Sequence, residues 1–381
     1  MVSRSYLAIV SWEYAHASWP AIRAALSRTP RGVRGWAGIV PHARGAWMNA
    51  WKSGAALLAA AVTALAAGCA TSPGDATAAA ALAGENPDIT VAAIPSADLA
   101  GLYVALDDGL FARQGLHVTI KKIASTKAVI ADQLSGQVDI GAGSYVGYIS
   151  AQAGGARFRI LAEASTLRPH TRVLLTAPGS RIESVGDLAG QKIGVNGTNS
   201  IGTLLISALF AENGISPAWA DFVTDKQGFP DMPGQLQRGQ WDAAFLAEPY
   251  ATKAEEDYGQ EELADLDQGA ALNFPIDGYV ATWAWTRTHP KAAAAFVRAA
   301  ETGQAIAQDD PPAARAAMGK SDGLPPEMTA VMSLPGFPTG PVNARRMQRT
   351  ADAMLQFGIL GRQYAAEVQQ GTLIRSMIAP G

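Results

Sequence analysis

The chain has 381 residues, of which 48% are hydrophobic, and its formal net charge is −3. This length exceeds the usual size of one domain and the hydrophobic content is sufficient for buried cores, so we expect two lobes and exclude extensive disorder in the body of the chain. Seven of the 30 basic residues but only one of the 33 acidic residues lie in the first 69 positions, which leaves the rest with a net charge of −9. A body that acidic is a poor binder of nucleic acid, so no nucleic-acid partner is expected.

Residues 48–68 have the pattern of a secretory signal. Met48 to Lys52 forms a short charged region, and the apolar run that follows ends in small residues. Cys69, the single cysteine of the chain, comes directly after it. This arrangement resembles a bacterial lipobox, although Ala66 stands where that motif usually has leucine. The resemblance implies a lipoprotein signal and lipidation of Cys69, and the alternative is a buried free cysteine.

The segments on either side of this signal are interpreted separately. Residues 1–47 have no assigned role, and one hypothesis is that translation starts at Met48. Residues 69–87 are rich in Ala, Gly, Ser and Pro, which predicts a flexible tether. The folded part is therefore expected to begin at about residue 88.

Residues 88–177 alternate between strand and helix patterns and are predicted to form the first part of lobe I. Strands are predicted over 89–94, 116–123, 137–140, 158–164 and 172–176, and helices over 99–108, 127–134 and 144–153. This alternation implies a largely parallel sheet that is covered on both faces.

Residues 178–277 repeat the alternation and are predicted to form lobe II, with the chain crossing into it at Pro178-Gly179-Ser180. Residues 278–381 are predicted to return to lobe I through a strand over 279–285 and to end in helices. Helices are expected over 184–188, 233–238, 248–256, 291–308, 312–318, 326–333 and 343–357, with strands over 192–195, 222–224 and 241–246. The fold class is α/β, with a mostly parallel, helix-flanked sheet in each lobe.

Two strand-turn-helix units carry the polar residues of greatest interest. In one, the turn Gly141-Ala142-Gly143 follows a strand and Ser144 caps the next helix. In the other, Asn196-Gly197 follows a strand and Thr198 to Ser200 offer N-cap side chains. A helix N-terminus suits an anionic or strongly polar group, because free backbone N–H donors and the positive end of the dipole meet there. Ligands of open parallel sheets bind beyond the carboxyl ends of the strands, so we expect the two turns to face each other across a cleft.

Four segments, taken together, resemble the substrate-binding proteins of ABC importers of the nitrate, sulfonate, taurine and thiamine-pyrimidine type. The segments are 95–118 (PSADLAGLYVALDDGLFARQGLHV), 137–145 (QVDIGAGSY), 187–215 (DLAGQKIGV to SALFAENGI) and 236–252 (LQRGQWDAAFLAEPYAT). The resemblance implies the type II periplasmic-binding-protein fold, in which two hinge crossings join the lobes and the lobes close over a small ligand. It also implies a monomer that delivers its ligand to an ABC permease in the membrane. The lipobox interpretation adds an extracytoplasmic location, anchored through Cys69.

Positions that match the ligand-facing positions of that family supply the candidate binding residues, to which we add polar residues at other strand ends. The candidates are Ser96, Asp98, Ser144, Tyr145, Gly197, Thr198, Asn199, Ser200, Glu248 and Asp277. Helix capping is the alternative role for the Ser, Thr and Asn residues and for Asp98. A ligand contact is better supported for Tyr145 than for the capping residues Ser144 and Thr198, because helix capping makes no use of an aromatic ring. Glu248 either accepts a hydrogen bond from a ligand amine or ring N–H, or interacts with a helix dipole as a first-turn residue.

The class of ligand stays open. Two helix N-termini favour an anion such as a sulfonate or nitrate. An ionised Glu248 would repel a sulfonate, and with aromatic residues such as Tyr145 and Trp283 it would suit a pyrimidine, another flat heterocycle or an amine. No metal site is expected, because the five histidines are scattered without metal-ligand spacing. No cofactor and no catalytic residue are expected either.

Two other functions remain as alternatives. One is an enzyme on the same fold related to thiamine-pyrimidine biosynthesis. Such enzymes use a cofactor-bound lysine, an active-site histidine and a cysteine-rich motif, whereas this chain has only Cys69 and no histidine in either glycine-containing turn. The other is a surface protein that uses the fold for adhesion or sensing, for which the helical C-terminus offers no positive signal.

Overall fold

The structure is a computed structural model that describes residue 82 and residues 84–378. The predictions for the signal segment, for Cys69 and for residues 1–47 lie outside these residues. Within the described part of the chain, no helix combines the length and hydropathy that a membrane crossing requires.

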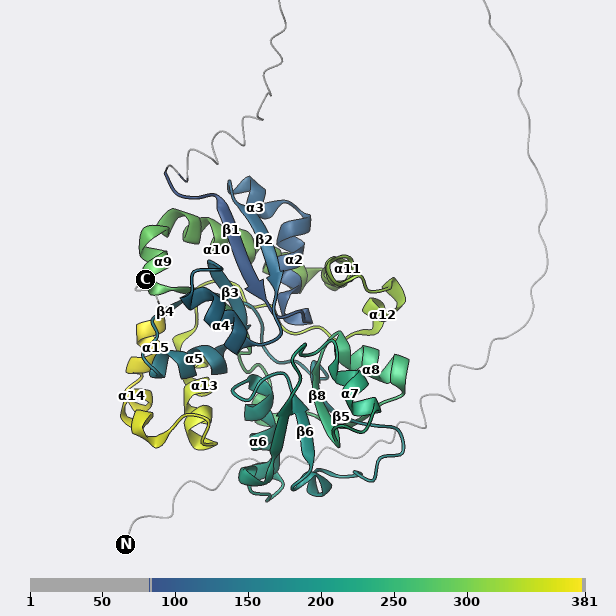
Figure 1. Cartoon of the computed structure of the whole chain (residues 1–381). Helices are drawn as coiled ribbons and strands as arrows, with labels where there is room; N and C mark the ends of the chain where they lie inside the picture. Colours follow the sequence, from purple (N-terminus) through teal and green to yellow (C-terminus); the bar gives the residue numbers. More distant parts are fainter. Residues whose placement is uncertain (1–81, 83, 379–381) are drawn as a thin grey trace, which may run out of the picture. The chain divides into compact units, whose positions relative to one another are not determined.

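The first sheet has five strands in the order β2-β1-β3-β10-β4 (Figure 1). β1 pairs in parallel with both β2 and β3, whereas β10 lies antiparallel between β3 and β4. The side chains of β1 alternate between two apolar cores, so helices cover the sheet on both faces. The strands are β1 (Asp88–Ala93), β2 (His117–Lys122), β3 (Ile140–Ser144), β4 (Phe158–Glu163) and β10 (Asp277–Thr282). The helices around them are η2 (Ala97–Leu99), α2 (Ala100–Asp107), α3 (Leu110–Arg113), α4 (Thr126–Leu134), α5 (Tyr145–Ala153), α9 (Trp283–Thr288) and α10 (Pro290–Asp309).

The second sheet repeats this plan, with strand order β7-β6-β8-β5-β9. β6 is parallel to β7 and β8, and β5 is antiparallel to β8 and β9. The fold class is therefore α/β with two lobes, as predicted from the sequence. The strands are β5 (Arg172–Thr176), β6 (Lys192–Val195), β7 (Asp221–Thr224), β8 (Ala243–Ala247) and β9 (Glu261–Asp265). The helices are η3 (Val185–Leu188), α6 (Ile201–Glu212), η4 (Pro217–Trp219), α7 (Met232–Gln237), α8 (Tyr250–Tyr258) and η5 (Gly269–Ala271).

Two segments connect the lobes, between β4 and β5 and between β9 and β10. They are hydrogen-bonded to each other, since Leu167 N donates to Phe274 O (2.9 Å) and Ile276 N donates to Ser165 O (3.0 Å). A third segment joins them, because Thr166 also pairs with Gly336. The chain thus leaves the first sheet before β5, and the prediction of a crossing at Pro178 put that strand in the wrong sheet.

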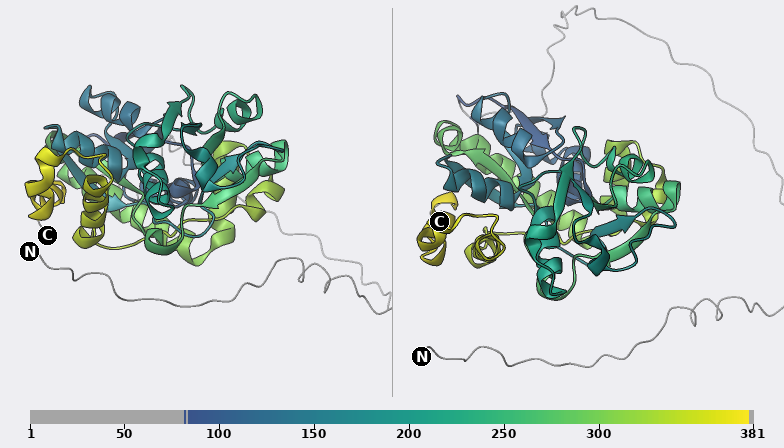
Figure 2. Two further views of the ribbon diagram at one scale, coloured as in Figure 1. Left: turned by 90° about the horizontal axis from the view of Figure 1, so that it is seen from below. Right: turned by 60° about the horizontal axis from the view of Figure 1, so that its bottom comes forward.

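The C-terminal helices follow α10 and return to the first lobe. Their bounds are α11 (Pro311–Asp322), α12 (Pro326–Val331), α13 (Ala344–Gln356), η6 (Arg362–Tyr364), α14 (Ala365–Gln369) and α15 (Thr372–Met377). α13 and α15 pack against α5, and α12 packs against α8 of the second lobe (Figure 2). The C-terminal region therefore contacts both lobes.

Three local predictions were wrong for identifiable reasons. Gly141 to Gly143 lie inside β3 rather than in a turn, and a Cβ on Gly141 would lie 2.0 Å from the Tyr148 hydroxyl. Trp283 opens α9 instead of continuing a strand, because the Thr282 side chain accepts a hydrogen bond from Trp285 N and caps that helix. The predicted tether ends early: Leu82 is buried, and the Glu85 carboxylate accepts hydrogen bonds from backbone N–H groups at the start of α10.

Candidate ligand-binding site

A small cavity lies where the two lobes meet. The space that a water-sized sphere can occupy there is about 10 Å³, room for one water molecule, so the lobes lie closed against each other. The residues around it come from the ends of strands and the starts of helices in both sheets, as expected for open parallel sheets. They are Ile94, Ser96, Asp98, Thr126, Ser144, Arg172, Asn196, Ser200, Ile201, Phe229 and Asp277.

An ion pair joins the lobes at this cavity. The Arg172 guanidinium, at the start of β5, donates through Nη2 to Oδ2 of Asp98, which follows β1. The Ser96 hydroxyl donates to the same carboxylate oxygen (2.7 Å). Burial alone would lower the pKa of Arg172, but the Asp98, Asp267 and Asp277 carboxylates raise it, so the guanidinium stays charged.

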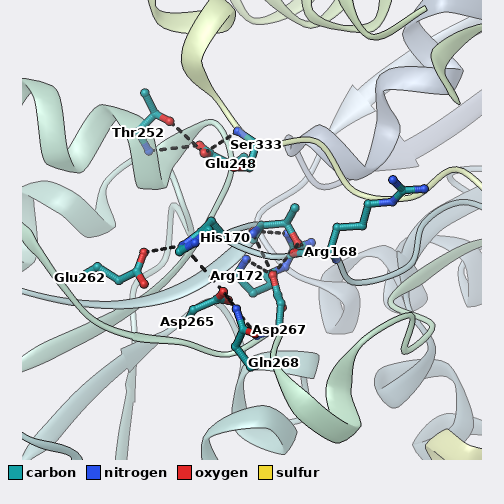
Figure 3. Close-up of polar contacts among 11 residues, drawn as sticks. Arg168, His170, Arg172, Glu248, Thr252, Glu262, Asp265, Asp267, Gln268 and Ser333 are labelled. Atoms are coloured by element: carbon teal, nitrogen blue, oxygen red, sulfur yellow. Dashed lines mark hydrogen bonds and ion pairs between the residues drawn. The ribbon is translucent and has the colours of Figure 1, made fainter. Parts of the chain in front are cut away.

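Asp267 supports Arg172 from outside the cavity. Its Oδ2 atom accepts hydrogen bonds from the backbone N–H groups of Thr171 (2.8 Å) and Arg172 (2.7 Å), and from the Thr171 hydroxyl (2.6 Å) (Figure 3). Burial raises the pKa of the Asp267 carboxyl to about 7, against the opposing effects of the Thr171 hydroxyl and of Arg172. Asp267 therefore fixes the backbone at the start of β5, from which the guanidinium extends.

Asp277 brings a second carboxyl group to the cavity. It begins β10 and lies opposite Ser144 in the antiparallel ladder. Its carboxyl group makes no hydrogen bond with any other described residue, although its side chain is buried. Burial raises the pKa of this carboxyl well above its ordinary value, the Asp98 charge adds to the rise, and Arg172 opposes it.

Several polar atoms of the cavity residues are buried without a hydrogen-bond partner. They are Asp98 Oδ1, Arg172 Nε, Asn196 Oδ1 and Ser200 Oγ. Buried polar atoms in folded proteins are nearly always paired, so each such atom needs an explanation. Four at one small cavity, two from charged groups, are what a site for a polar ligand requires.

Helices α5 and α6 both begin at the cavity, and their N-termini differ in which polar groups they leave without a hydrogen bond. At α5, Tyr145 N donates to Ile276 O (3.0 Å), Val146 N to Ser144 Oγ (3.2 Å), and Ser144 N to Thr126 Oγ1 (3.0 Å). At α6, by contrast, the Ser200 hydroxyl has no partner. The polar groups at the start of α5 are thus already used by the protein.

The structure brings five of the ten predicted residues to the cavity: Ser96, Asp98, Ser144, Ser200 and Asp277. Tyr145 lies in the apolar core, and its ring packs so closely on β10 that a Cβ atom on Gly278 would overlap it. Thr198 and Asn199 are exposed and Gly197 is half-buried, and none of the three lines the cavity. Contact of these residues with a ligand stays a prediction.

Glu248 has a full set of protein partners and does not line the cavity. Its carboxylate accepts hydrogen bonds from Thr252 N (3.1 Å), the Thr252 hydroxyl (2.9 Å) and Ser333 N (3.0 Å) (Figure 3). Burial raises its pKa, and these hydrogen bonds counteract the rise. Its backbone oxygen also accepts a hydrogen bond from Ala97 N (2.8 Å), so Glu248 connects the second lobe to both the first lobe and the C-terminal region.

Sequence reasoning missed two central residues of the cavity. Arg172 is the first residue of the strand RVLLT, which is otherwise without charge. A single basic residue at the start of a buried strand was the sequence signal that could have identified it as a cavity residue. Asn196 was predicted to lie in the second turn but was not proposed as a binding residue. Its buried amide lies at the end of β6, next to the start of α6.

A family model described as NMT1/THI5 like matches residues 96–314, which is more than half of the chain and includes strands of both sheets. No curated protein matches the chain.

Solved structures share the fold. The alkanesulfonate-binding protein SsuA from Xanthomonas axonopodis pv. citri, bound to MOPS, aligns with a TM-score of 0.66 at 16% identity over 78% of this chain and 99% of that one. The periplasmic nitrate-binding protein NrtA from Synechocystis PCC 6803 aligns with a TM-score of 0.63 at 15% identity, over 77% and 88%. A Candida albicans protein with the generic periplasmic binding protein fold aligns with a TM-score of 0.65 at 15% identity, over 77% and 96%. These alignments confirm the predicted fold.

Proposed function

The chain belongs to the NMT1/THI5-like family, and from this membership and the interlobe cavity we propose that it is an extracytoplasmic solute-binding protein of an ABC importer. It captures a small polar organic or anionic ligand between its lobes and delivers the ligand to a membrane permease. The observation that carries this proposal is the set of buried, unpartnered polar atoms at a cavity formed by both lobes.

Ligand binding and lobe closure are coupled in this proposal. The cavity takes Asp98, Ser144 and Asp277 from the first lobe, and Arg172, Asn196 and Ser200 from the second. A ligand that touches both sets holds the lobes together, at a spacing wider than the one-water cavity described above, and so shifts the population away from open arrangements. The hydrogen-bonded segments between the lobes are where the backbone changes needed for opening are expected to occur.

Retention at the membrane is the second part of the proposal. Lipidation of Cys69 would keep the protein close to its permease, and the residues between Cys69 and the first buried residue, Leu82, would form the connection. The similarity to the periplasmic protein NrtA supports a location outside the cytoplasm.

Calorimetry and melting curves of the purified protein test the proposal. The ligands are nitrate, aliphatic sulfonates, amines and pyrimidines, each at up to millimolar concentration. A true ligand at 100 times its dissociation constant stabilises the folded state by about 2.7 kcal/mol, which gives a measurable rise in melting temperature. Absence of binding across all of these classes would contradict a solute-binding role.

The enzyme related to thiamine-pyrimidine biosynthesis stays a prediction. Among the described residues, those that line the cavity include neither a histidine nor a lysine, so nothing there favours that chemistry. Turnover of a pyrimidine precursor by the purified protein would replace the binding role with a catalytic one.

A further inference from the structure

We infer that the interlobe cavity, once the lobes part enough to enlarge it beyond its present room for one water molecule, takes a small organic cation that carries N–H donors, such as an alkylamine, amidine or guanidine, and not a sulfonate or nitrate. This inference rests on the proposed solute-binding function and specifies the ligand for it. The juxtaposition that carries it is two carboxyl groups, Asp98 and Asp277, at a cavity whose only basic side chain among the described residues, Arg172, already forms an ion pair with Asp98.

The formal charges around the cavity do not favour an anion. Arg172 is the only basic residue among the described residues that line it, and its Nη2 atom donates to Asp98. The Asp267 carboxyl group, which accepts a hydrogen bond from the Arg172 backbone N–H, also interacts electrostatically with the same guanidinium. One cation therefore serves three carboxyl groups, so an incoming oxyanion would find no unpaired positive charge and a cation would find an unpaired carboxyl group.

The unpartnered atoms lead to the same conclusion by a separate route. Asp98 Oδ1 and the Asn196 side-chain oxygen are buried acceptors without donors, and the Asp277 carboxyl group has no hydrogen bond. Against these stands one unpartnered charged donor, Arg172 Nε, and the Ser200 hydroxyl can act in either way. Hydrogen-bond acceptors outnumber donors among these unpartnered groups, so the complementary ligand is one that donates hydrogen bonds.

Helix N-termini at the cavity favour anions in principle, yet at α5 the backbone N–H groups of Ser144, Tyr145 and Val146 already have acceptors within the protein. Asp277 lies directly opposite Ser144, the N-cap of α5. The partial charge at a helix N-terminus is only about half of an elementary charge. The Asp277 carboxyl group thus lies at the start of α5, and a cationic ligand within hydrogen-bonding distance of it favours its ionised form, against the effect of burial.

The rest of the wall indicates an organic ligand rather than a bare ion. Ile94, Ile201 and Phe229 supply apolar surface beside the carboxyl groups. In the described part of the chain, no group of three or more His, Cys, Asp and Glu residues is arranged to hold a metal ion. A ligand with a charged N–H head and a small hydrocarbon part matches both kinds of surface.

Isothermal titration of the purified protein with four probes tests the inference. The cations are acetamidine and methylguanidine, and the anions are methanesulfonate and nitrate. We expect at least one cation to bind at least tenfold more tightly than either anion. If an anion binds as tightly as the cations or more tightly, the inference is wrong while the solute-binding role stands. If none of the four binds, the inference is wrong, and the proposed function fails as well when the amines and pyrimidines of the wider screen also leave the melting temperature unchanged.

A pair of variants locates the binding. Asp277→Asn should weaken cation binding at least tenfold, because it removes the unpaired carboxylate. The matched control is Asp221→Asn, which changes an exposed aspartate of the second sheet, outside the cavity, and should leave the affinity within twofold. Equal affinities in Asp277→Asn and in the wild type would overturn the assignment. If Asp277→Asn does not fold, as judged by circular dichroism, the comparison of cations with anions on the wild type decides alone.

Discussion

Glu248 and Asp277 are both buried acidic residues close to the ends of strands, and the sequence alone gives them the same candidate role. Glu248 accepts three hydrogen bonds from Thr252 and Ser333, whereas the Asp277 carboxyl group accepts none from the described residues. One is therefore a connector within the protein, and the other is available to a ligand. The comparison teaches that hydrogen-bond partners, more than burial or position, distinguish a carboxylate that is used within the protein from one that is a candidate for ligand binding.

Breaking the ion pair between Arg172 and Asp98 should have the largest effect on the protein, because the pair both joins the two lobes and lines the cavity. Arg172→Met leaves a buried carboxylate unpaired, and we expect a loss of about 4 kcal/mol in the free energy of unfolding, together with loss of ligand binding. Urea denaturation measures the first and calorimetry the second. The double variant Arg172→Met with Asp98→Leu should recover most of the stability but no binding. An equally unstable double variant would show that the ion pair is not the cause.

Glu248→Ala should have the next largest effect, on stability alone. It leaves the Thr252 and Ser333 backbone N–H groups without acceptors, at a cost of about 3 kcal/mol in the free energy of unfolding. Ligand affinity of the folded protein should change less than twofold, because Glu248 does not line the cavity. A large loss of affinity with little loss of stability would reverse the comparison between the two carboxylates.

Asp277→Asn should instead stabilise the protein at neutral pH in the absence of ligand. The folded state raises the pKa of this carboxyl group, mainly by burial, so it binds more protons than the unfolded state does. Its contribution to stability is thus full below the ordinary aspartate pKa and is lost as the pH rises through the folded-state value.

Melting curves of the wild type and the Asp277→Asn variant from pH 3.5 to pH 8 measure this effect. Asp267, with a pKa of about 7, makes stability depend on pH in the same direction in both proteins. The difference between the two curves therefore reports on Asp277. The variant should gain relative to the wild type as the pH rises. A constant difference across the range would contradict the raised pKa.

The smallest expected effect concerns His170, in the segment that leads into β5. Its hydrogen bond with Glu262 (3.0 Å) is the main cause that raises its pKa above the ordinary 6.5, and the ring is largely exposed. The stability it contributes is present below pH 6.5 and is lost as the pH rises through the folded-state pKa. A proton NMR titration should show a lower His170 pKa in Glu262→Gln, and an unchanged value would mean that Glu262 is not the cause.

Local sequence patterns were sufficient for the alternation of strands and helices and for the two lobes, and they named five residues that line the cavity, whose contact with a ligand stays a prediction. They could not assign β5 to a lobe, because RVLLT is equally good as a buried strand in either sheet. Nor could they reveal pairs distant in sequence. Asp98 meets Arg172 across 74 positions and Ser333 meets Glu248 across 85, and only the folded chain separates the capping, core and cavity roles of similar residues.

Leu82 and Glu85, near the start of the described part of the chain, already pack on the folded protein, which limits how far the protein could lie from a membrane anchor at Cys69. If Cys69 holds a lipid anchor, only 13 steps of chain separate it from Leu82, the first buried residue in the described part of the chain. Even a fully extended chain of that length spans no more than roughly 45 Å. The solute would then be carried within one protein diameter of the bilayer, so its transfer depends on encounters in the plane of the membrane rather than on diffusion in bulk solution.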